Sequence, residues 1–79
     1  MTKQTLNEVL EVMANKASIA NIAKAEGTYK NMRECPIYSE LHGMEQMLKI
    51  MGIDFEYEFN NEVTKMTAIK ANGMRVEIA

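Results

Sequence analysis

The sequence predicts one α+β domain over residues 1–79, with two helical segments packed on one face of a three-stranded antiparallel meander, in the order ααβββ. Three observations lead to this fold class. Apolar residues recur at helical spacing through the first two-thirds of the chain. Ile53–Phe59 alternates strictly between apolar and acidic residues, which is typical of a strand with one buried face. Asn72-Gly73 stands between two apolar runs and predicts a two-residue hairpin turn.

The first helical segment follows a capping box, in which Thr5 is the N-cap and Glu8 reaches back to it. Its apolar residues form two stripes. The first consists of Leu6, Val9, Leu10, Met13, Ala17 and Ala20, and the second of Val12, Ile19, Ile22 and Ala23. Two structures can serve both stripes: either the helix breaks near Asn15–Ser18, or it runs to Glu26 and its second stripe meets a partner. In both cases Gly27 ends the helix in a left-handed conformation.

The second helical segment begins at Pro36, which fits the first turn of a helix because its missing N–H needs no partner there. The polar stretch Thr28–Cys35 before it is predicted to be a loop. A clean apolar stripe then consists of Ile37, Leu41, Met44, Met47, Leu48 and Met51. Gly43 lies inside this helix, and Gly52 ends it.

The turns predict the register of the sheet. The hairpin at Asn72-Gly73 sets Ala71 opposite Met74 and Ile69 opposite Val76. A three-residue loop, Asn60–Glu62, is predicted between the first two strands because it places their apolar residues on one face. It pairs Phe59 with Val63 and Ile53 with Ile69. The predicted core is Leu6, Val9, Leu10, Met13, Leu41, Met44, Leu48, Met51, Phe55, Tyr57, Ile69 and Val76.

The outer face of this sheet is the candidate partner-binding surface. In the predicted register Met66 and Ala68 point away from the helices, and they are rimmed by the acidic side chains of Asp54, Glu56 and Glu58. Such a surface suits a basic groove on another protein. We therefore expect a small non-catalytic interaction module, an inhibitor or adaptor of a larger protein. Small acidic inhibitors encoded by phages and mobile elements offer an analogy of size and charge.

Enzymatic activity is not expected. Cys35 and His42 are the only candidates for a nucleophile and its base, they are seven residues apart, and no motif surrounds them. A metal site could draw only on His42 with Glu45 and Glu40, without a second histidine or a thiolate. No phosphate-binding glycine motif is present, and no cofactor is implied.

The expected location is the cytoplasm. A single cysteine suits a reducing compartment, no apolar stretch follows the N-terminus as in a signal peptide, and no apolar run approaches membrane-spanning length. The net charge of −2 argues against nonspecific nucleic-acid binding, which requires a basic surface.

A second function is nevertheless open. Residues 22–32 place a small residue four positions before Gly27, which resembles helix-turn-helix regulators. The resemblance implies DNA contacts from Lys30, Asn31 and Arg33, with the downstream hairpin as a wing. Glu26 and Thr28 flank the glycine where that motif has apolar residues, and Pro36 would interrupt the recognition helix.

The oligomeric state is predicted to be either a monomer or a two-fold homodimer. The last strand, Met74–Ala79, is an edge strand with few charges to prevent pairing with another edge. The second stripe of the first helix offers another dimer surface.

Overall fold

The first helix, α1, is unbroken. The computed structural model describes all 79 residues, and α1 spans Lys3–Glu26. Thr2 is its N-cap, because the Thr2 hydroxyl accepts a hydrogen bond from the Thr5 N–H at 3.1 Å. The prediction that Thr5 caps the helix is therefore wrong: both threonines can cap, and the upstream one adds almost a turn. Gly27 ends the helix at φ 65°, as predicted.

A short 3₁₀ helix and the second α-helix follow. The 3₁₀ helix η1 (Met32–Glu34) begins where the Asn31 side chain accepts a hydrogen bond from the Arg33 N–H at 2.9 Å. Helix α2 spans Pro36–Ile50, with proline in its first turn as predicted. After α2, Gly52 adopts φ 73° and turns the chain toward the sheet.

The sheet is an antiparallel meander of β1 (Phe55–Phe59), β2 (Met66–Ala71) and β3 (Met74–Glu77) in the order β1-β2-β3. The hairpin between β2 and β3 is confirmed. Asn72 and Gly73 both have positive φ, at 49° and 80°, as a type I′ turn requires. Ala71 pairs with Met74 and Ile69 with Val76, as predicted.

The predicted loop between β1 and β2 is wrong. Ile69 pairs with Tyr57, four residues along β1 from the predicted Ile53. The Asn60 side chain closes a longer loop, because its oxygen accepts hydrogen bonds from the N–H groups of Thr64 and Lys65 at 2.9 and 3.2 Å. A shift by an even number of residues keeps each β1 side chain on its predicted face. Val63, predicted to face the helices, lies in the loop with φ 55°.

A β-bulge at Thr67 breaks the alternation of β2. Glu58 pairs with Ala68 and Phe59 with Met66, so Thr67 is an extra residue on β2. An extra residue reverses the side of the sheet that strict alternation predicts for the side chain beyond it, here Met66. Met66 therefore packs against the core, and the prediction that it points away from the helices is wrong.

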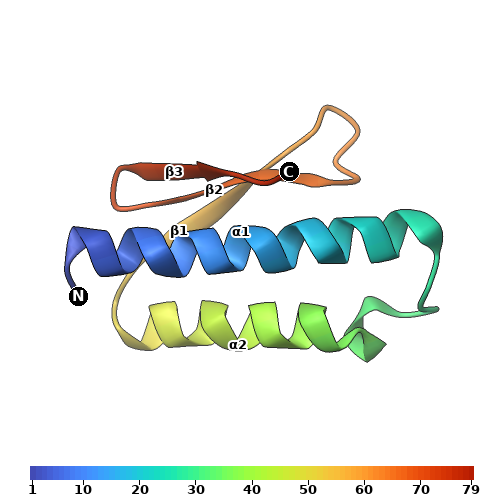
Figure 1. Cartoon of the computed structure of the whole chain (residues 1–79), viewed down its shortest axis with the longest axis horizontal. Helices are drawn as coiled ribbons and strands as arrows, with labels where there is room; N and C mark the ends of the chain where they lie inside the picture. The colour runs from blue at the N-terminus through green and yellow to red at the C-terminus, as the bar shows by residue number, and fades with distance from the viewer.

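Helix α1 lies along the middle of the molecule. Figure 1 shows antiparallel α2 on one side of it, and β2 and β3 on the other. The core forms where these three layers meet, and it consists of Leu6, Leu10, Met13, Ala14, Ala17, Leu41, Leu48, Ile69, Ala71 and Ile78. The predicted core residues Val9, Met44, Phe55, Tyr57 and Val76 are partly buried against it. Met51 is 45% exposed, and its assignment to the core is wrong.

Candidate functional site

The outer face of the sheet carries a ladder of alternating charges. Glu56 pairs with Lys70 at 2.9 Å, and Lys70 lies 3.9 Å from Glu58. Arg75 donates two hydrogen bonds to the Glu58 carboxylate, at 2.8 and 3.3 Å, and a third to Glu77 at 3.3 Å. The ladder thus joins three carboxylates to two cations, and most of the acidic charge on this face is paired.

The ladder also shifts the ionisation of its members. The hydrogen bonds from Arg75 lower the pKa of Glu58 below its usual value. The contact with Glu56 raises the pKa of Lys70, and the contact with Glu58 raises that of Arg75. These side chains remain exposed to solvent, so the ladder adds little to stability and gives no carboxylate the buried surroundings of a general acid.

The five residues predicted to bind a partner do not form one surface. Glu56 and Glu58 belong to the ladder, whereas Asp54 precedes β1 and is exposed outside it. Ala68 lies on the outer face in register between Glu58 and Glu77, but no part of it reaches solvent. Met66 lies on the opposite side of the sheet. Whether the three acids bind a partner remains a prediction.

A second surface, which we call the outer helical face, runs along α1 and α2. Its exposed members on α1 are Val12, Ile19 and Ile22 from the second apolar stripe, and on the α2 side Met47 and Met51, the residue that follows α2. Each is between 45% and 57% exposed. Because α1 is continuous, its second stripe is not buried within the chain. Of the two alternatives compatible with the sequence, the structure contains the continuous helix to Glu26, and whether its second stripe meets a partner stays a prediction.

The Lys16–Glu40 ion pair shows that the α1 and α2 parts adjoin. Its atoms are 3.2 Å apart across the seam between the two helices. On α1, Val12 and Ile19 lie four and three residues from Lys16, and so on the same side of the helix. On α2, Met47 and Met51 lie seven and eleven residues from Glu40, which is again the same side. Val12 and Ile19 on α1 and Met47 on α2 therefore share the side of the helices on which the polar bridge lies.

The predicted recognition helix is absent. Lys30, Asn31 and Arg33 are exposed, but Lys30 lies in a bend and Arg33 in the three-residue helix η1. Neither presents a helix long enough to enter a major groove. The helix-turn-helix arrangement is therefore wrong, because the chain after Gly27 forms an irregular loop up to Pro36.

Cys35 and His42 have different surroundings. Cys35 is a free, buried thiol, whereas the His42 ring is exposed and lies 3.4 Å from the Glu45 carboxylate. Glu40, the third residue of the considered metal site, pairs with Lys16 instead. No group of three or more histidine, cysteine or acidic side chains is placed to hold a metal ion.

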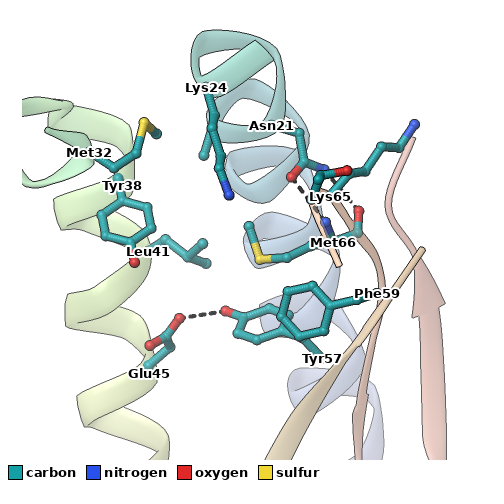
Figure 2. Close-up of a pocket in the computed structure, with 12 residues that line it drawn as sticks. Asn21, Lys24, Met32, Tyr38, Leu41, Glu45, Tyr57, Phe59, Lys65 and Met66 are labelled. Atoms are coloured by element: carbon teal, nitrogen blue, oxygen red, sulfur yellow. Dashed lines mark hydrogen bonds between the residues drawn. The ribbon is translucent and has the colours of Figure 1, made fainter. Parts of the chain in front are cut away.

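A cavity of about 270 Å³ opens at the end of the molecule where α1 ends and α2 begins. Figure 2 shows Tyr38, Tyr57, Phe59 and Met66 around it. The Tyr57 hydroxyl donates a hydrogen bond of 2.6 Å to Glu45 at its base. We call this cavity the end cavity. No local pattern in the sequence predicted it, because one of its walls depends on the bulge at Thr67.

None of the helices combines the length and the apolar character needed to cross a membrane.

Comparisons with known proteins find no relative. No family model, no curated protein and no solved structure matches the chain.

Proposed function

We propose that the protein is a non-catalytic interaction module that binds a larger protein through its outer helical face, as an inhibitor or adaptor. The observation that carries the proposal is the row of half-exposed apolar side chains on the two helices. Five such side chains present on the order of 500 Å² of apolar surface, the range in which a patch on a monomer is often functional. Two of these five side chains, Met47 and Met51, are methionines, whose flexible side chains adapt to a partner.

The outer sheet face is the second candidate for the same function. Its acids were the basis for expecting a basic partner, and three of them extend along one edge of the sheet. Pairing with Lys70 and Arg75 reduces the field they present, so a basic partner would have to compete with the ladder. A cytoplasmic location belongs to the proposal, and the unpaired thiol of Cys35 supports it.

The test is capture of partners from native lysate by the tagged chain. Ile19→Glu places a charge in the middle of the outer helical face, and we expect it to reduce capture at least tenfold. Gln46→Glu is the matched control, because it adds the same charge on an exposed side of α2 outside the apolar row. Since Ile19 is already half-exposed, both variants should unfold within about 0.5 kcal/mol of the unmodified protein.

A triple charge reversal of Asp54, Glu56 and Glu58 to lysine separates the two surfaces. Capture lost in this variant and kept in Ile19→Glu would assign the partner to the outer sheet face and overturn the proposal. Light scattering on the purified protein identifies a second copy as the occupant. A dimer that Ile19→Glu converts to a monomer would show that the outer helical face pairs with itself rather than with a larger protein.

A further inference from the structure

The end cavity is a second site, separate from the outer helical face. It lies between the last turns of α1, the first turns of α2, and strands β1 and β2. Its floor is made by Ala20 and Leu41, which are both almost fully buried. Tyr57 and Phe59 form the sheet-side wall, and Tyr38 faces them from α2 (Figure 2). The walls are therefore largely aromatic and apolar, as in sites for small organic ligands.

Asn21 and the bulge at Thr67 hold the cavity open. The Asn21 amide donates to the Met66 carbonyl at 2.8 Å and accepts from the Met66 N–H at 3.1 Å. These two bonds fix the start of β2 against α1, and the bulge directs the Met66 side chain into the cavity wall. The wall is thus built from backbone that is bonded on both sides, and not from a loose loop.

One cation points into the cavity. Figure 2 shows the Lys24 side chain descending from α1 so that its ammonium lies between Tyr38 and Met66. Lys24 takes part in no ion pair. Lys65 also lines the cavity, but Figure 2 shows its ammonium pointing away from it. The carboxylate of Glu45, at the base, is already engaged by the Tyr57 hydroxyl at 2.6 Å and by His42 at 3.4 Å.

We propose that the end cavity binds a small aromatic carboxylate, with the ring between Tyr38 and the sheet and the carboxylate at Lys24. The end cavity is large enough for such a ligand. A cavity of roughly 150 Å³ holds a benzene molecule, and about 270 Å³ leaves space for a short chain that carries the carboxylate. Aromatic walls suit a planar ring through stacking and edge contacts. The unpaired ammonium of Lys24 selects an anion over a neutral or cationic group of the same shape.

The test is a titration of the ¹⁵N-labelled full chain with phenylacetate, followed by nuclear magnetic resonance. We expect saturable shifts of the amides of Asn21, Leu41 and Tyr57. The neutral isostere phenylacetamide should bind about fivefold more weakly, the difference expected for one exposed charge pair at about 4 Å. In Lys24→Met the two ligands should bind equally, and in the matched control Lys65→Met the preference for the acid should persist.

Three outcomes would overturn the proposal. The first is the absence of saturable shifts at the three amides. The second is an equal effect of the two lysine variants, which would make Lys24 one of several surface charges. The third is tighter binding of 2-phenylethylamine than of phenylacetate, which would show that Glu45 sets the preference. Because both lysines are exposed, neither variant threatens the fold. Partner capture by Lys24→Met, measured in parallel, should equal that of the unmodified protein, because Lys24 does not belong to the outer helical face. Failure of the cavity proposal is thereby distinguished from failure of the proposed function.

Discussion

Asn21 joins the first helix to the sheet through both the nitrogen and the oxygen of its side-chain amide. Its two hydrogen bonds satisfy the backbone N–H and carbonyl of Met66, as a neighbouring strand would. In Asn21→Ala both groups lose their partner in partly buried surroundings, and we expect a loss of about 2 kcal/mol in the free energy of unfolding. Urea denaturation at neutral pH measures it.

Asn15→Ala is the matched control for this prediction. Asn15 lies exposed on the same helix, so its replacement changes helix propensity alone, by at most about 0.7 kcal/mol in favour of alanine. Equal stabilities for the two variants would show that the Asn21 bonds contribute nothing.

Tyr57 makes the stability sensitive to alkaline pH. Burial of the phenol, helped by its hydrogen bond to Glu45, raises the pKa of Tyr57 well above its usual 10.0. The folded protein therefore holds this proton where the unfolded chain releases it, and the resulting stabilisation is complete below pH 10 and lost above it. Between about pH 10 and pH 11 the free energy of unfolding should fall by up to about 1.4 kcal/mol from this group.

Tyr57→Phe removes that dependence. Urea unfolding at about pH 9 and about pH 11 should show a smaller decrease for Tyr57→Phe than for the unmodified protein. Tyr29→Phe, a change in the loop after α1, serves as the control and should keep the larger decrease. The same decrease in all three proteins would show that Tyr57 is not the group responsible.

At the scale of the element, replacing either of two glycines by alanine is expected to change the free energy of unfolding in opposite directions. Gly43 lies inside α2, where an added Cβ would meet no atom within 4 Å, so Gly43→Ala should raise the free energy of unfolding by about 1 kcal/mol. Gly27 ends α1 at φ 65°, and Gly27→Ala should lower it by about 1 kcal/mol, because a side chain is strained in that conformation.

Calorimetry compares the two variants directly. For a domain of this size about 1 kcal/mol corresponds to a shift of about 4–8 °C in the unfolding midpoint. A lower midpoint for Gly43→Ala would mean that α2 needs its glycine for another reason, such as close approach of a partner.

The elements themselves were largely predictable from local chemistry. Helix ends follow from Gly27, Pro36 and Gly52, and the second hairpin follows from Asn72-Gly73, because proline locks its φ and glycine and asparagine tolerate the positive φ that these positions require. The first hairpin was not predictable in this way. Its loop depends on the Asn60 side chain reaching two N–H groups four and five residues ahead, and apolar alternation alone cannot distinguish registers that differ by two or four residues.

At the scale of the whole molecule, the packing of the two helices and the sheet determines which apolar stripe is buried and which is exposed. Two helices and three strands bury only 13 of 79 residues, so the second stripe of α1, Met47 and Met51 stay outside the core. The sequence showed that this stripe exists, but not that Met47 and Met51 adjoin it, since that depends on how α1 and α2 pack. A partner that covers this face would also stabilise the fold by mass action.

The bulge at Thr67 determines how β2 responds to the loss of a codon. Because Thr67 is left without a partner on β1, Met66 lies opposite Phe59 on the core side of the sheet, where it lines the end cavity. An in-frame loss of the Thr67 codon would place Met66 directly before Ala68 in regular alternation, still opposite Phe59 and on the core side of the sheet. A three-nucleotide deletion at the bulge therefore leaves each paired side chain of β2 on its own surface. Loss of a codon within the regular part of the strand would instead move side chains from one surface to the other without altering their chemistry.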